Sequence, residues 1–478
     1  MRTQPAIPAW RLATIAAGLS AALAAPAYAR DDDTQALLRK MNERLEQLEK
    51  RNQTLEQEVK VLRQTAAAPA PASVQSAADA ARIEKLEQQV KELAAAPHED
   101  KPEEEGGSGI EIGGSLVAIY QHVNDKGSDT GDRESRVNYR GDIEVSLPVA
   151  GIGDAQGKAF AHVRFGQGEG IGLRPTHVGV PNSLAFETGA GHDDSFAILA
   201  QAWYQLTWPL KAGGFNDQPG DRVELTIGKM DFFGFFDQND AAGDEASQFL
   251  NNAFVHNALL DTGGDIAADA YGFAPGVRLA YVNEGDGSYS WRASLGMFGS
   301  GDGANFSDKV TTDPLTIAQL EYTTKQINGE ARGNYRVYAW TNGNTQDLVG
   351  TEQRHSGWGL SVDQKLWRDW SLFGRYGKRT SGDGLFDSAL TGGFQLGGAA
   401  WSRRNDAIGL GLGRLKTGDE QRVASGVGGK EKLVELYYRA KLNEQLELSP
   451  HVQYIRDPAG DGSAPSVKIF GMRAGLSF

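Results

Sequence analysis

Apolar and polar residues alternate strictly through the last twelve residues of the chain. Every second position back from the terminal Phe478 is apolar, namely Phe470, Met472, Ala474 and Leu476. The residues between them are small or polar, so a strand would separate the two sets onto opposite faces. This pattern is typical of the last strand of an outer-membrane barrel, which ends on an interfacial aromatic. We therefore interpret Phe470, Met472, Leu476 and Phe478 as a signal for the barrel-assembly machinery; the alternative is a soluble β-sandwich.

The same alternation recurs from residue 110 onward, in segments of roughly ten residues separated by Gly, Asp and Asn clusters. We predict an all-β, antiparallel transmembrane barrel over residues 110–478. At roughly 20–25 residues per strand with its connection, this length predicts 16 strands, with 18 as the alternative. Barrels of this size enclose an aqueous channel. Residues 167–194, 299–314 and 377–398 are rich in turn residues, and we expect them to be extracellular or lumen-folded loops.

Residues 38–62 follow a different period, with apolar side chains three and four positions apart. This spacing predicts an α-helical coiled coil of nearly four heptads. One polar residue in the seam, Asn52, is typical of positions that fix register and strand number. We predict that the seam forms a homo-oligomer, with a trimer favoured; the alternative is one amphipathic helix lying against the barrel. The seam residues are Leu38, Met41, Leu45, Leu48, Asn52, Leu55, Val59 and Leu62.

The remaining segments complete the predicted organisation. Residues 1–29 combine Arg2 and Arg11 with a short apolar run and an Ala-Tyr-Ala end, which predicts a secretory signal peptide. An Ala/Pro stretch at 66–78 interrupts the predicted periplasmic coiled-coil segment, 30–97, and an acidic linker occupies 98–109. Removing two arginines with the signal peptide changes the formal charge from −14 to −16 (−14 minus 2). This charge argues against nucleic acid as a partner.

Several stretches of the barrel region resemble the carbohydrate-selective porins of the OprB type. They are the segment 228–231 with 236–239 and 248–251, the sequence GNYRVYAW at 333–340, the run 372–377, and the segment 404–411 with 435–439. The resemblance covers about residue 110 to residue 478. It implies a 16-stranded barrel in the outer membrane of a Gram-negative bacterium that passes monosaccharides or small oligosaccharides by facilitated diffusion. The long heptad segment departs from the simplest members and is similar to the periplasmic coiled coils of some trimeric sugar porins.

Candidate solute contacts follow from the face on which each residue should lie. Alternation in the sequence GNYRVYAW places Tyr335, Val337 and Ala339 toward lipid. The residues between them, Arg336, Tyr338 and Trp340, should face the lumen. Aromatic rings beside an arginine suit the apolar faces and hydroxyl groups of a sugar; the alternative is that these rings support a folded-in loop. Residues 232–249 should include such a loop, although a plug or a subunit contact are alternatives. The candidates are Arg336, Tyr338, Trp340, Arg375, Glu435, Arg439, Asp237 and Asn239.

Three functions remain open from the sequence. A sugar porin is favoured. A channel for small organic anions is the first alternative, suggested by Arg136, Arg140, Arg336, Arg375 and Arg439. A structural link between the outer membrane and the periplasm is the second, suggested by the coiled coil. The eight His do not cluster at metal spacing, and no nucleotide-binding or Ser-His-Asp motif stands out. We therefore expect no enzyme activity, no metal and no cofactor. The expected partners are outer-membrane lipid, small sugars and the barrel-assembly machinery.

Overall fold

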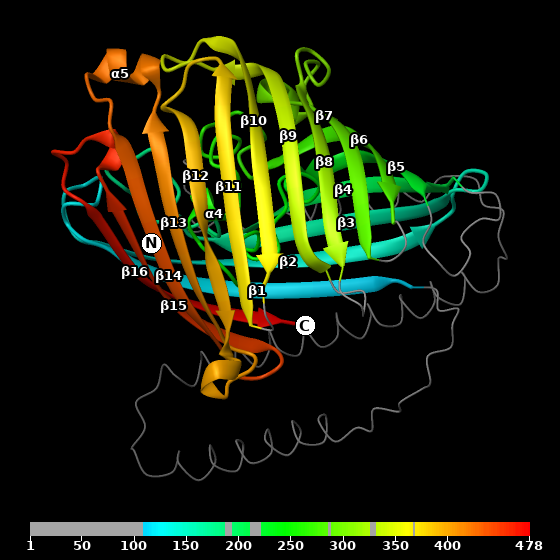
Figure 1. Ribbon diagram of the computed structural model, residues 1–478, viewed down its shortest axis with the longest axis horizontal. Helices are drawn as coiled ribbons and strands as arrows, with labels where there is room; N and C mark the ends of the chain where they lie inside the picture. The colour runs from blue at the N-terminus through cyan, green and yellow to red at the C-terminus, as the bar shows by residue number, and fades with distance from the viewer. Residues whose placement is uncertain (1–108, 187–193, 211–220, 285–287, 326–330, 367–368) are drawn as a thin grey trace, which may run out of the picture. The chain divides into compact units, whose positions relative to one another are not determined.

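A computed structural model describes residues 109–186, 194–210, 221–284, 288–325, 331–366 and 369–478. Within these residues, sixteen antiparallel strands form one closed barrel (Figure 1). This confirms the predicted strand number. The strands are β1 (Glu111–Val123), β2 (Glu134–Val149), β3 (Gln156–Gln167), β4 (Phe196–Pro209), β5 (Arg222–Asp231), β6 (Phe273–Asn283), β7 (Tyr289–Phe298), β8 (Leu315–Lys325), β9 (Ala331–Gln346), β10 (Glu352–Lys365), β11 (Trp370–Ser381), β12 (Phe386–Gly397), β13 (Ala407–Thr417), β14 (Lys430–Lys441), β15 (Leu446–Arg456) and β16 (Val467–Ser477).

The first and last strands close the barrel. Leu116 lies opposite Leu476, and this register continues to Val123 opposite Ile469. The backbone of Phe478 extends the pairing, because its N–H donates to the carbonyl of Gly114 and its carbonyl accepts from the N–H of Gly114. Closure matters because lipid offers no hydrogen-bond partners to an open sheet edge.

Alternation along each strand separates an apolar exterior from a polar interior. On β9, Tyr335 and Val337 are 38% and 44% exposed, whereas the intervening Arg336 is 5% exposed. On β16, Phe470 is 52% exposed and Arg473 is 1% exposed. The outward set is therefore the one that the period of two predicts.

The connections at the two ends of the barrel differ in length. Residues 442–445 and 150–155 make short turns at one end, and residues 232–272 make the long connection between β5 and β6 at the other. Short turns are periplasmic in this class of barrel, so we assign the long connections to the extracellular side. We call residues 168–186 loop 2 and residues 232–272 loop 3. The short helices are α4 (Asn252–Val255), α5 (Asp419–Ser425), η1 (Gly301–Asn305), η2 (Gly398–Trp401) and η3 (Pro458–Gly460).

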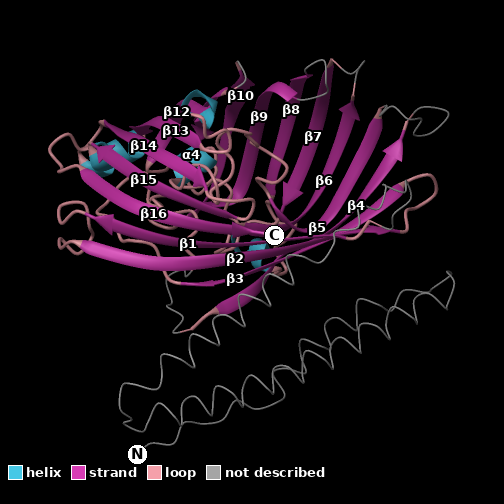
Figure 2. Ribbon diagram, turned by 90° about the horizontal axis from the view of Figure 1, so that it is seen from below, coloured by secondary structure: helices cyan, strands magenta, loops and turns pink. Residues whose placement is uncertain are grey.

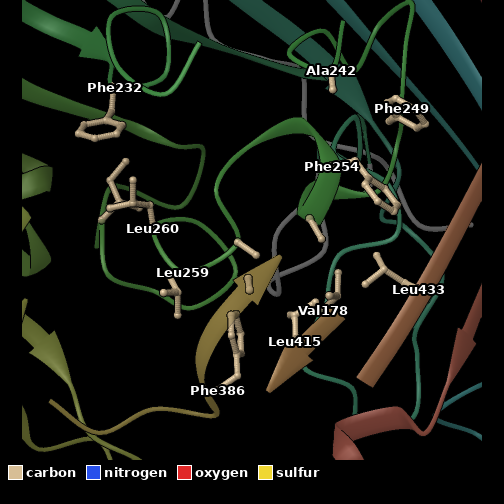
Figure 3. Close-up of a cluster of buried hydrophobic side chains, with 14 of the residues drawn as sticks. Val178, Phe232, Ala242, Phe249, Phe254, Leu259, Leu260, Phe386, Leu415 and Leu433 are labelled. Carbon is tan, nitrogen blue, oxygen red and sulfur yellow. The ribbon is translucent and has the colours of Figure 1, made fainter. Parts of the chain in front are cut away.

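The hydrophobic core lies inside the barrel, where loop 3 packs against the inner wall. Phe249 and Phe254 of loop 3 contact Phe373 of β11, and Phe249 also meets the ring of Tyr437 on β14. Figure 3 shows Phe249 and Phe254 near Leu433, with Leu259 and Leu260 farther along the same cluster. Helix α4, within loop 3, lies inside the ring of strands (Figure 2). Loop 3 therefore fills part of the lumen with apolar side chains.

One sequence expectation is wrong. Residues 377–398 do not form a long loop, because they belong largely to β11 and β12 with a turn at 382–385. Gly382 and Gly384 lie in that turn, but other glycines of this stretch lie in strands and allow close packing within the sheet. A Cβ atom at Gly393 would lie 1.9 Å from the carbonyl oxygen of Leu410 and 2.8 Å from the ring of Phe373. Glycine inside a strand often marks such a close approach.

The predicted signal peptide, the coiled-coil segment and nearly all of the acidic linker lie outside the described residues. In the part of the chain that is described, no helix is both long enough and apolar enough to cross a membrane.

Candidate solute pathway through the lumen

Three groups of buried polar contacts are among those that fix loop 3 to the barrel wall. The first is centred on Asp237, whose side chain is fully buried and lies 3.1 Å from the guanidinium of Arg375 on β11. Tyr338 on β9 donates a hydrogen bond of 2.6 Å to the same carboxylate, and the backbone N–H of Asn257 donates another of 2.6 Å. Arg375 also donates to the carbonyls of Ala242 and Phe254. Two distant parts of loop 3 thus meet at one wall arginine.

The second group joins the middle of loop 3 to β14 and β15. Glu435 accepts hydrogen bonds from the backbone N–H groups of Leu250 and Asn251, at 2.8 and 2.9 Å. The side chain of Asn251 donates to Gln453 at 3.0 Å and also caps the first turn of α4 by accepting from Ala253. Glu435 and Asn251 are almost fully buried. This carboxylate therefore holds backbone rather than facing open solvent.

The third group surrounds Asp265 near the end of loop 3. Its carboxylate accepts the indole N–H of Trp340 at 2.9 Å and lies 2.9 Å from Nδ1 of His355. Arg379 on β11 pairs with the same carboxylate at 2.7 Å. Burial alone would raise the pKa of Asp265, but Arg379 and His355 lower it below its ordinary value. The carboxylate thus stays ionised beside its partners.

The local sequence of loop 3 explains how it turns so tightly. The side-chain oxygens of Asn239, Asn251 and Asn257 each accept a hydrogen bond from the N–H two residues ahead. Such contacts are the usual reason that Asn occurs in turns. The wall makes room for Asn257, because a Cβ atom at Gly377 would lie 2.5 Å from its side-chain oxygen.

A cavity of about 850 Å³ remains between loop 2, loop 3 and the wall of β2 and β3. Both signs of charge and several rings reach it. The principal lining side chains are Arg140, Arg164, Asn182, Ser183, Phe186, Asp231, Phe233, Asp237, Asn239, Glu245, His256, Asp261, Tyr271 and Arg375.

The charges in this cavity are compensated by neighbours. Arg140 on β2 lies 2.9 Å from Glu245 of loop 3 and 3.0 Å from Asp142. Asp142 also pairs with Arg164 at 2.6 Å and with His162 at 2.7 Å. Burial alone would raise the pKa of Glu245, but Arg140, Arg164 and His256 lower it. The cavity therefore offers ionic donors and acceptors side by side.

Aromatic rings line the loop 3 side of the cavity. Phe233 stacks on His256 with ring centroids 3.7 Å apart and an angle of 3° between the planes. His256 lies 2.5 Å from Asp261. Burial alone would lower the pKa of His256, but Asp261, Glu245 and Asp231 together raise it above its ordinary value. On the barrel wall, the guanidinium of Arg164 lies 5.1 Å from the ring centroid of Phe273, within cation–π distance.

Further ion pairs follow the inner wall beyond this cavity. Glu224 pairs with Arg222 and Arg278 at 2.9 and 3.1 Å. Arg336 lies 2.6 Å from Glu321 and 3.0 Å from Asp363. Arg222 and Glu224 lie on the same strand, β5, whereas the other three pairs join neighbouring strands. Charges of both signs therefore lie side by side along the wall.

A second cavity, of about 790 Å³, opens at the end with the short turns. Arg439, Lys441 and Glu447 contribute to its lining. This cavity lies on the periplasmic side of loop 3, and no residue of loop 3 lines it.

The structure places all eight predicted lumen residues inside the barrel, but in different environments. Tyr338, Trp340 and Glu435 hold loop 3 and do not line either cavity. Arg336 belongs to the wall ion pairs, and Arg439 lines the periplasmic cavity. Three residues both hold loop 3 and line the larger cavity, namely Asp237, Asn239 and Arg375.

Sequence reasoning missed the residues that give the larger cavity its character. Phe233, His256 and Glu245 lie on loop 3, where no periodicity indicates which side chains face open space. The density of Phe and Asp within residues 232–249 was the one available signal. Arg140 and Arg164 could be assigned to the lumen, since they lie on strands with clear alternation.

Comparisons with known proteins agree with this architecture. Porin B of Pseudomonas aeruginosa is 24% identical over 337 residues, which cover 59% of this chain and 71% of that protein. The high-pH structure of Pseudomonas putida OprB has a similar fold, with a TM-score of 0.59 and 18% identity over 78% of this chain and 94% of that one. The model of the carbohydrate-selective porin family, OprB, matches residues 150–478. The chain therefore belongs to the OprB family of carbohydrate-selective outer-membrane porins.

Proposed function

We propose that the chain passes small carbohydrates by facilitated diffusion through the cavity between loop 3 and the wall of β2 and β3. The observation that supports this most strongly is that one cavity is lined both by the ion pair of Arg140 and Glu245 and by the stacked rings of Phe233 and His256. Charged donors and acceptors suit sugar hydroxyls, and ring faces suit the C–H patches of a pyranose. Weak contacts of both kinds allow a sugar to bind in the channel and still leave on the other side.

The charge balance favours neutral solutes over anions. Of the arginines that suggested an anion channel, Arg136, Arg140, Arg336 and Arg375 are each ion-paired with carboxylates. A compensated arginine attracts a free anion weakly, because the carboxylate beside it repels that anion. Small organic anions are therefore the second candidate class, and reversal potentials under a salt gradient separate it from the first.

Solute flux into liposomes tests the proposal. The full-length porin is reconstituted, and swelling rates are compared for glucose and for a neutral solute of equal size without hydroxyl groups. Phe233→Ala removes a ring from the cavity. Phe306→Ala is the matched control, since Phe306 is 61% exposed and lies on the connection between β7 and β8.

Glucose should enter faster than the equal-sized control solute, and Phe233→Ala should reduce that preference while Phe306→Ala leaves it unchanged. Equal rates for both solutes through the unmodified porin contradict carbohydrate selectivity. A strong anion preference in the reversal potential supports the second candidate instead.

The amino-terminal heptads support a further part of this proposal. The seam from Leu38 to Leu62 joins copies of the chain in the periplasm, with a trimer as the favoured state. The alternating carboxy-terminal strand that ends at Phe478 addresses the chain to the barrel-assembly machinery. A role in tying the outer membrane to the periplasm would require the heptads but not the cavity, so deleting residues 34–95 separates the two roles.

A further inference from the structure

Three basic side chains lie side by side on the outer surface of the barrel. Arg414 on β13 is directly opposite Lys432 on β14, and Lys432 is directly opposite Arg456 on β15. All three point outward, because the residues beside them in sequence, Leu415 and Leu433, are buried inside. The side chains of Lys432 and Arg456 are 50% and 65% exposed. We call Arg414, Lys432 and Arg456 the basic row.

Like charges in directly opposite cross-strand positions destabilise a sheet. Here they occur twice within the basic row, and Lys416 opposite Lys430 repeats the arrangement one step nearer the extracellular end. Among the described residues, the one carboxylate paired with the basic row is Asp457, at 2.8 Å from Lys432 and 3.6 Å from Arg456. The barrel thus maintains a local excess of positive charge.

The basic row lies where lipid headgroups begin. On β15, ten residues separate Leu446 at the short-turn end from Arg456, a rise of roughly 26 Å for a strand tilted by about 40°. The apolar band of such barrels is about 25 Å tall. Two residues toward the periplasm from the row, Leu412 on β13 and Tyr454 on β15 are 53% and 37% exposed. A cation at this depth meets the outer-leaflet headgroups while apolar neighbours meet acyl chains.

The far side of the barrel lacks this feature at the same level. The outward residues near the extracellular ends of β5 to β9 include Ile227, Val277, Met297, Thr316 and Thr341, all uncharged. Outward cations also lie on β10, β11 and β16 (Arg354, Lys378 and Lys468), but Arg354 and Lys378 are paired with Asp313 and Asp387, whereas the basic row has one paired carboxylate for three cations.

We propose that the basic row binds the phosphate groups of the phosphorylated glycolipid of the outer leaflet, lipopolysaccharide. Phosphate oxygens accept hydrogen bonds from guanidinium and ammonium groups, and Arg414 and Arg456 can each bind such a group in bidentate fashion. The anion also offsets the repulsion within the row, while Leu412 and the ring of Tyr454 contact the acyl chains. The excess positive charge over adjacent apolar surface selects an anionic amphiphile over a second protein chain.

Native mass spectrometry of the full-length porin in detergent tests the binding. The probes are diphosphoryl lipid A, the same lipid with its phosphates removed, and inorganic phosphate. The test variant is Arg414→Gln/Lys432→Gln/Arg456→Gln. The matched control is Lys309→Gln/Arg354→Gln/Arg422→Gln, which removes three exposed extracellular basic groups that already pair with Asp302, Asp313 and Asp419.

The unmodified porin should bind diphosphoryl lipid A, and the test variant should lose affinity on the order of 100-fold, from roughly fivefold for each cation near an anionic headgroup. The control variant should keep its affinity within about threefold, because its groups are already paired. Unchanged sugar flux through the test variant shows that the barrel is folded, independently of the lipid result. If the triple variant does not assemble, the single variant Lys432→Gln takes its place in the same lipid-binding measurement.

Three results overturn the proposal. Equal binding of phosphorylated and dephosphorylated lipid assigns the contact to acyl chains alone. Inorganic phosphate that binds as tightly as the lipid assigns the row to a free anion. A loss of oligomers, rather than of lipid, in the test variant assigns the row to a contact between copies of the chain.

Discussion

Arg375→Met is the sharpest test of how loop 3 is held in the lumen. Arg375 is 3% exposed and Asp237 is 1% exposed, so their ion pair is shielded from water. Methionine keeps most of the side-chain length but removes the charge and the hydrogen bonds to Ala242 and Phe254. Asp237 then keeps the donors from Tyr338 and Asn257 but no cation.

Breaking a buried pair from one side costs about 3–5 kcal/mol, because the remaining charge is left in a poorly polar environment. Loop 3 should loosen around Asp237 while the contacts at Glu435 and Asp265 still hold its other parts. We expect a higher single-channel conductance, greater current noise and a lower unfolding temperature. Planar-bilayer recordings and the temperature of the folded-to-unfolded mobility shift on gels measure these effects.

Arg336→Met is the matched control. Arg336 is equally buried, but its partners Glu321 and Asp363 both lie on the wall. It should lower stability without raising current noise. Adding Asp237→Asn to Arg375→Met should recover part of the lost stability, because the stranded charge is gone. Unchanged conductance and noise in Arg375→Met, or the same noise in Arg336→Met, would refute the assignment of Arg375 as an anchor of loop 3.

Three further predictions concern other parts of the chain. The pKa of His256 is raised in the folded state. Its protonated ring should therefore stabilise the fold fully at pH values below the unfolded pKa of about 6.5, and this stabilisation should disappear as the pH rises through the folded pKa. The unfolding temperature should fall across this pH range, and His256→Gln should flatten its dependence on pH. Asn52→Leu should strengthen association of the chain but mix oligomeric states, as measured by analytical ultracentrifugation, and an unchanged monomeric profile would argue against the seam. Deleting Phe478 removes its paired hydrogen bonds to Gly114 and the terminal aromatic, so the assembled fraction in outer-membrane preparations should fall several-fold, whereas Ser477→Ala should leave it unchanged.

The barrel could be predicted from the sequence because its governing pattern is local. A period of two fixes which side of β9 carries Arg336, and it does so without knowledge of any partner. Length favoured sixteen strands and left eighteen as the alternative, and the structure has sixteen. Where that reasoning failed, at residues 377–398, only Gly382 and Gly384 lie in a turn, whereas Gly377 and Gly393 lie in strands and allow close packing.

The roles of the lumen residues could not be predicted in the same way. Trp340 was expected to face the lumen, and it does, but its indole N–H donates to Asp265, which lies 75 positions away. Such a contact depends on the path of loop 3, which carries no periodic pattern. For the same reason Phe233 and His256, which line the larger cavity from loop 3, were not recognised as site residues.

Single-channel current in the presence of sugar tests the central claim most directly. If small carbohydrates pass through the cavity beside Phe233 and Arg140, glucose should reduce the conductance of the unmodified porin in a saturable way, and Phe233→Ala should weaken that reduction. A current that glucose lowers only in proportion to solution viscosity, equally in both proteins, would contradict a carbohydrate-binding pathway at this site.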